Sequence, residues 1–193
     1  MKIKNLDVRF SQMRIKSVML LLGMTAISLI TTSAYGAAPF REYPIGDSIE
    51  RNKMEIAAVW LPPVKMNNMP NMDDLKKNKK GETIHIEADI HATEGNENGF
   101  GAGEWIPSLK VGYVLKGSNG KVIQGNLFPM VAKDGAHYGA QIFLPYGKYK
   151  LIFNIAPPNS MEFGRHTDPV TGVAPWWQPF EASWNFDFKG AKK

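Results

Sequence analysis

The stretch Thr83-Ile84-His85-Ile86-Glu87-Ala88-Asp89-Ile90-His91 alternates apolar and polar residues with a period of two. This alternation predicts a β-strand, because successive side chains of a strand point to opposite faces. One face would pack on a core through the apolar residues Ile84, Ile86, Ala88 and Ile90. The other face would carry a row of polar side chains, with neighbours about 7 Å apart: His85, Glu87, Asp89 and His91. Two imidazoles and two carboxylates in one row are a set of potential metal ligands.

Six further segments have the length and composition of β-strands, and glycine, proline or asparagine residues separate them. They are residues 55–61, 108–115, 121–127, 137–144, 149–155 and 180–188. Hairpin turns are predicted at Ser118-Asn119-Gly120 and at Tyr146-Gly147, and no segment has a sustained helical period. The pattern predicts an all-β domain, an immunoglobulin-like antiparallel β-sandwich of about seven to nine strands.

The chain begins with a segment that has the features of a secretory signal peptide. A basic region precedes the apolar run Val18–Ile30, and Ala34-Tyr35-Gly36 supplies small residues for cleavage. We therefore expect that residues 1–36 are removed, that residues 37–193 form one domain, and that nothing inserts into a membrane after cleavage. A retained membrane anchor is the alternative, although the apolar run is short for a bilayer span.

Composition narrows the function classes. The formal net charge is +5, but most of the excess lies in the leader segment, so no nucleic-acid partner is expected for the domain. The chain has no cysteine, which excludes disulfides, iron–sulfur clusters, thiolate zinc sites and a blue-copper site. The sequence also lacks the motifs of a nucleophilic serine, a phosphate-binding loop and a dinucleotide-binding turn.

A metal site is the chemistry that the polar residues favour. Met130 closes one predicted strand and His137 begins the next, with a turn at Asp134-Gly135 between them, so both side chains should lie close together. A thioether beside an imidazole suits copper, whereas imidazole with carboxylate also suits iron. The predicted site has a mixed set of ligands: His85, Glu87, Met130, His137 and His166.

Three observations allow other interpretations. Any single histidine can have a structural role. The carboxylates of Glu87 and Asp89 could serve as the acid and the base of a glycoside hydrolase. The run Met66-x-x-Met69-x-x-Met72 could capture Cu(I), because thioethers are soft ligands, or it could be a flexible loop with incidental methionines.

With these residues identified, the sequence resembles the FetP-like family of periplasmic high-affinity iron-transport proteins. The matching motifs follow one another along almost the whole predicted domain. They are residues 43–47, 54–59, 85–92, 98–100, 129–132 with Asp134-Gly135, 137–140, 163–166 and 171–173.

The resemblance implies a homodimer, with copper bound near the dimer interface by His85, Met130, His137 and His166 and with Glu87 close by. It also implies iron binding and a role beside an inner-membrane iron permease. Asp134 matches an acidic position of the family pattern. A second metal site, or supporting contacts around the first one, could be formed by Asp134, His91 and Asp89.

The sequence and the resemblance together predict a periplasmic, dimeric metal-binding protein of a high-affinity iron-uptake system, with copper and iron as its metals. We expect a transport protein rather than an enzyme. Three alternatives stay open at this point: a periplasmic copper chaperone or resistance protein, a mononuclear-copper iron oxidoreductase, and an adhesion or sugar-binding sandwich without a metal.

Overall fold

The computed structural model describes residues 42–67 and 77–191. The predicted leader 1–36, Met69 and Met72 lie outside these residues. The described residues contain ten strands: β1 (Tyr43–Pro44), β2 (Ile49–Arg51), β3 (Met54–Leu61), β4 (Lys77–Asn78), β5 (Gly81–Ala92), β6 (Lys110–Gly117), β7 (Val122–Ala132), β8 (Gly135–Pro145), β9 (Gly147–Ala156) and β10 (Phe180–Phe188). Within the described ranges there is no helix that could span a membrane.

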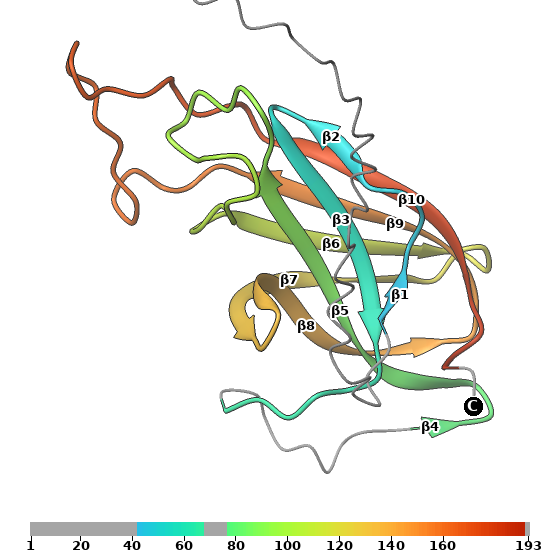
Figure 1. Ribbon diagram of the computed structural model, residues 1–193. Coiled ribbons are helices and arrows are strands. Elements are labelled where there is room, and N and C mark those ends of the chain that lie inside the picture. The colour runs from blue at the N-terminus through green and yellow to red at the C-terminus, as the bar shows by residue number, and fades with distance from the viewer. Residues whose placement is uncertain (1–41, 68–76, 192–193) are drawn as a thin grey trace, which may run out of the picture. The chain divides into compact units, whose positions relative to one another are not determined.

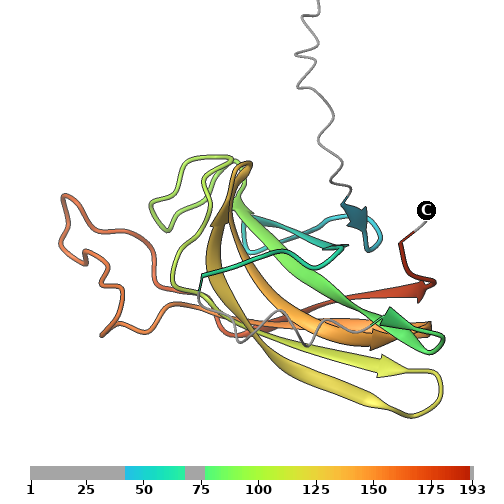
Figure 2. The ribbon, with the colours of Figure 1, turned by 90° about the horizontal axis from the view of Figure 1, so that it is seen from below.

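All strand pairs are antiparallel, and the strands follow the order β1-β3-β5-β8-β7-β6-β9-β10. Strand β7 belongs to both layers of the domain, because it pairs with β6 up to Leu127 and with β8 from Phe128 onward. The sheet therefore folds over on itself, and β3 and β5 lie across β6, β9 and β10 (Figures 1 and 2). This arrangement confirms the predicted all-β antiparallel sandwich.

One continuous core fills the space between the two layers. On β5 the predicted apolar face, Ile84, Ile86, Ala88 and Ile90, is completely buried. Leu151, Phe153 and Ile155 of β9 cover it from the opposite layer and are buried to the same extent. Each of these isoleucine, leucine and phenylalanine side chains contributes about 1.5–3 kcal/mol by its burial, so the alternation that predicted the strands also stabilises the fold.

The predicted strand boundaries differ from the observed ones mainly at turns. Strand β6 begins at Lys110 rather than at Ser108, because Ser108 has a backbone φ of 59° that no strand residue adopts. The predicted hairpin at Ser118-Asn119-Gly120 is confirmed, because β6 and β7 pair with each other. Tyr146 and Gly147 do connect β8 to β9, but the predicted hairpin is wrong there: β8 pairs with β5 and β7 and β9 pairs with β6 and β10, so the chain passes from one layer to the other. A second hairpin, β7–β8, pairs Met130 directly with His137, as the spacing of these two residues predicted.

Candidate metal centre

The candidate site lies on the outer face of the layer that contains β5, β8 and the second half of β7. In the β5–β8 ladder, His85 lies opposite Gln141 and Glu87 lies opposite Gly139. Residues paired in this way share one face of the sheet, and the intervening residues of both strands point into the core. In the β7–β8 ladder, Met130 lies opposite His137. The two ladders on either side of β8 therefore bring the polar side chains of β5 beside His137 and Met130.

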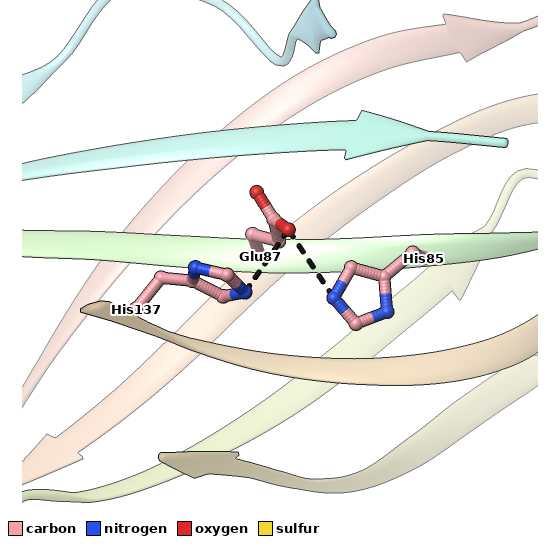
Figure 3. Close-up of side chains that lie close together, drawn as sticks. All are labelled: His85, Glu87 and His137. Atoms are coloured by element: carbon pink, nitrogen blue, oxygen red, sulfur yellow. Dashed lines mark ion pairs between the residues drawn. The ribbon is translucent and has the colours of Figure 1, made fainter. Parts of the chain in front are cut away.

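Three of the predicted ligands form a compact cluster. The Nε2 atoms of His85 and His137 lie 3.2 Å and 3.1 Å from the same oxygen of Glu87, Oε1. The two imidazole rings are 5.9 Å apart and nearly perpendicular, and the Glu87 carboxylate lies between them (Figure 3). Each of the three residues offers one ligand atom, and these three atoms lie within 4.8 Å of one another. One ion could therefore contact all three side chains.

His85 has unsatisfied polar atoms. Its side chain is completely buried, and neither ring nitrogen has a hydrogen-bond partner among the described residues. Nε2 does approach Glu87, but the direction of approach is not that of a hydrogen bond. A buried polar atom without a partner costs about 1–3 kcal/mol, so this imidazole is placed for a ligand that the protein atoms do not supply.

Gly139 makes room for the cluster. A Cβ atom at this position would lie 2.7 Å from Nε2 of His85 and 3.0 Å from the sulfur of Met130. The imidazole nitrogen and the thioether sulfur therefore converge on the space above this glycine. Met130 joins His85, Glu87 and His137 as a fourth potential ligand, and any larger residue at 139 would occupy the space that they share.

Acidic groups surround this cluster. Burial, followed by the charges of Glu87, Glu42 and Asp134, raises the pKa of Asp89 to about 7. The pKa of Glu42 is also raised. Although this residue is largely exposed, desolvation is the largest cause, followed by the charges of Glu87 and Asp134 and by a hydrogen bond to Asp134. So many carboxylates in one place repel one another unless a proton or a cation compensates for their charge.

His137 is held in the form that binds metals. Burial lowers its pKa, and the neighbouring imidazole of His85 adds to this effect, although the Glu87 carboxylate opposes it. The ring is also hydrogen-bonded to the backbone of Gly135. A hydrogen bond of this kind fixes the orientation of the ring and leaves the other nitrogen for a ligand, and Nε2 is the nitrogen that faces Glu87.

The cluster opens into a cavity of about 510 Å³. His85, Glu87, Met130 and His137 contribute to its wall, together with Glu42, Asp134, Val131 and the segment Val64–Asn67. The cavity is much larger than a single ion. It leaves space beside the cluster for further ligands or for a segment of another molecule.

Two predicted residues do not join the cluster. His166 lies in the long loop between β9 and β10; its side chain is 73% exposed, and its Nδ1 is 2.7 Å from the hydroxyl of Thr171. His91 shares the outer face of β5 but lies at the far end of that strand, opposite Glu55 and beside Trp105. Within this single chain the structure thus brings together His85, Glu87, Met130 and His137, with Asp134 and Asp89 nearby.

Two residues near the site, Glu42 and Gly139, were not predicted from the sequence. Glu42 precedes the two-residue strand β1, which has no alternation to analyse, and only the pairing of β1 with β3 brings it near the site. Gly139 lies within strand β8, and a glycine in a strand can mark a close approach of other groups. The glycine itself was visible in the sequence, but it did not show that His85 and Met130 are the groups that approach it.

The donor set fits a transition metal. Two imidazoles, one carboxylate and one thioether are suitable ligands for copper, and the nitrogen and oxygen donors also suit iron. The class of protein that this fold and site define is a β-sandwich with a buried histidine–carboxylate cluster.

The comparison with known families is direct. The family model of the Fe2+ transport protein matches residues 39–190, and the chain belongs to this family. A UPF0423 protein of Brucella abortus is 42% identical over 172 residues, which cover 86% of this chain and 92% of that protein. The 34 kDa membrane antigen of Treponema pallidum is 38% identical over 164 residues, 81% of this chain and 79% of that protein.

Solved structures agree with this assignment. FetP from uropathogenic Escherichia coli has a TM-score of 0.70 at 45% identity, covering 79% of this chain and 99% of that one. Copper-reconstituted P19 from Campylobacter jejuni has the same TM-score at 44% identity, with the same shares covered. Copper is also bound in a variant of each protein in which a glutamate is replaced by glutamine.

Proposed function

We propose that this chain is a periplasmic metal-binding protein of a high-affinity iron-uptake system, and that it binds copper and iron through His85, Glu87, Met130 and His137. The observation that carries the proposal is the buried His85 imidazole, whose two nitrogens lack hydrogen-bond partners and which lies beside Glu87 and His137. The family and the expression of FetP in the periplasm support the location and the role.

Copper is the metal with the stronger support. Imidazole and thioether donors suit it, and copper-bound forms of FetP and P19 support its assignment to this chain. Divalent copper also binds most nitrogen and oxygen sites more tightly than ferrous iron does. Copper would therefore compete with iron at this site. Iron would be favoured by the carboxylates of Glu87, Asp89 and Asp134, which are harder ligands than imidazole and thioether.

His166 completes the site in our proposal from a second copy of the chain. Its loop extends away from the sandwich (Figures 1 and 2), and its imidazole is exposed. The cavity wall carries Val131, which is 80% exposed, and Phe128 on the same strand is 54% exposed. Exposed apolar side chains around a polar cavity favour a partner surface, and a two-fold dimer is the commonest arrangement.

An inner-membrane iron permease is the partner in our proposal, and the assignment to an Fe2+ transport family supports this choice. A copper chaperone would have the same copper site but no affinity for iron. The distinction between the two functions therefore depends on whether the purified domain binds iron at the same residues.

The test uses copper and iron titrations of the mature domain, its His137→Ala variant and a matched control, His91→Ala. Both histidines lie on strands of the same layer, but only His137 contacts Glu87. We expect His137→Ala to weaken copper binding by more than about 100-fold and His91→Ala to leave it unchanged. Equal affinities in all three proteins would refute the site, and an absence of iron binding would favour the chaperone.

A complementation experiment tests the shared site. His166→Ala subunits keep the cavity, and His137→Ala subunits keep the loop histidine. If the loop of one subunit completes the cavity of the other, a mixture of the two variants will regain high-affinity copper binding in its heterodimers. A mixture that binds no better than either variant alone, or a chain that sediments as a monomer with and without copper, would refute this arrangement.

A further inference from the structure

The segment that follows β3 returns across the candidate cavity. The backbone N–H of Val64 donates a hydrogen bond of 3.0 Å to Oε1 of Gln141, and Gln141 lies directly opposite His85 in the β5–β8 ladder. The segment is thus attached beside the buried imidazole. Met66 follows two residues later and lines the same cavity as Met130.

Packing does not explain the position of Met66. The core cluster of the described residues contains Met54, which is completely buried, but neither Met66 nor Met130. Met66 is only partly buried and lies between strands rather than on one. Two methionines therefore reach a polar cavity that already holds two imidazoles and a carboxylate, although methionine is ordinarily a residue that fills gaps in apolar cores.

We propose that Met66 is a further copper ligand, specific for Cu(I), beside the His85–Glu87–His137 cluster; this inference rests on the proposed copper site. A thioether is a soft, neutral donor that selects Cu(I), whereas a carboxylate is a hard donor. With Met66, the cavity contains two donor sets. The buried imidazoles and Glu87 suit Cu(II), and the two thioethers with a neighbouring imidazole suit Cu(I).

The consequence concerns the oxidation state of the metal. A second thioether would raise the affinity of the cavity for reduced copper relative to oxidised copper. The same cavity could then hold either ion, Cu(II) mainly through the imidazoles and Glu87 and Cu(I) mainly through the thioethers. Because a thioether does not titrate, its contribution to Cu(I) binding does not depend on pH.

The experiment compares the parent domain with Met66→Leu and with a matched control, Met161→Leu. Leucine removes the sulfur but nearly keeps the volume and the apolar character, and Met161 is 91% exposed on the β9–β10 loop, away from the cavity wall. Cu(I) affinity is measured without oxygen by competition with bicinchoninate, and Cu(II) affinity by a separate competition. X-ray absorption of the Cu(I) forms counts the sulfur neighbours.

We expect Met66→Leu to lower the Cu(I) affinity at least about tenfold, to leave the Cu(II) affinity unchanged, and to remove one sulfur neighbour from Cu(I). Met161→Leu should behave like the parent. If the parent binds both ions and Met66→Leu binds Cu(I) equally well, or if both affinities fall together, Met66 is not a Cu(I)-specific ligand. If the parent binds neither ion, the proposed copper site itself is wrong.

Discussion

The close approach of His85 and Met130 to Gly139 gives the sharpest test of the candidate site, because a substitution of this glycine removes no ligand. In Gly139→Ala, the new Cβ would lie 2.7 Å from Nε2 of His85 and 3.0 Å from both Cε1 of the same ring and the sulfur of Met130. Favourable non-bonded contacts begin near 3.5 Å, so the imidazole would have to retreat by about 0.8 Å. Metal–ligand distances tolerate about 0.2 Å.

Two effects should follow from this displacement. Copper affinity should fall at least about 10–100-fold, the range seen when a ligand loses its fixed orientation. The metal-free domain should also lose stability, because His85 is completely buried and cannot move without strain. Overpacking of this kind costs about 1–3 kcal/mol, which corresponds to roughly 3–10 °C in the unfolding temperature of a domain of this size.

The measurements are copper competition titrations and thermal unfolding with a chelator present. Gly112→Ala is the matched control: it also places alanine within a strand of the sandwich, but its Cβ would meet nothing closer than 3.7 Å. We expect this control to bind copper like the parent. If Gly139→Ala keeps the copper affinity and the stability of the parent, the ligand atoms do not converge above this glycine, and our description of the site is wrong.

Three further predictions concern charge. Glu87→Gln should weaken iron binding more than copper binding, because the carboxylate is the hard ligand and the imidazoles remain; equal losses in parallel titrations would contradict this. Copper affinity should stay constant from about pH 8 to the ordinary imidazole pKa of about 6.5 and fall only in more acidic solution, because the lowered pKa of His137 delays competition by protons; constant affinity down to about pH 4 would exclude ligation by histidine. The pKa of Asp89 is raised in the fold to about 7, so this carboxyl favours folding in acid and loses that contribution as the pH rises through about 7. Without metal, Asp89→Asn should therefore gain about 1–3 kcal/mol over the parent between about pH 5 and pH 8.5, and parallel denaturation curves at both pH values would refute the shift.

The alternation of residues 83–91 was sufficient to predict strand β5 and its apolar face, because period two is a property of the backbone. The alternation could not predict how deeply the polar side chains of β5 are buried. The polar row was expected on an open face, yet His85 is completely buried and Glu87 nearly so. The end of β7 and the segment around Val64 line the cavity above these residues, and neither contact follows from the sequence of β5.

The hairpin of Met130 and His137 was predictable for a different reason. Short hairpins fix their own register, and the observed turn, Lys133-Asp134, lies one residue before the predicted Asp134-Gly135 but still places Met130 opposite His137. Glu42 shows the limit of this reasoning. Its approach to Asp134 depends on strands far apart in the chain, and no local pattern encodes such a contact.

The lack of cysteine acquires a new meaning beside this site. No covalent bond joins distant parts of the sandwich, and a metal held by His85 of β5 and His137 of β8 would close a long loop of the chain, whereas Met130 and His137 close only a short hairpin. Closing a longer loop removes more freedom from the unfolded chain, and an ion that binds only the folded state stabilises it by mass action. The metal would thus be a removable cross-link: loaded molecules should survive proteases that degrade empty ones, and the amount of protein in the cell would follow the supply of metal.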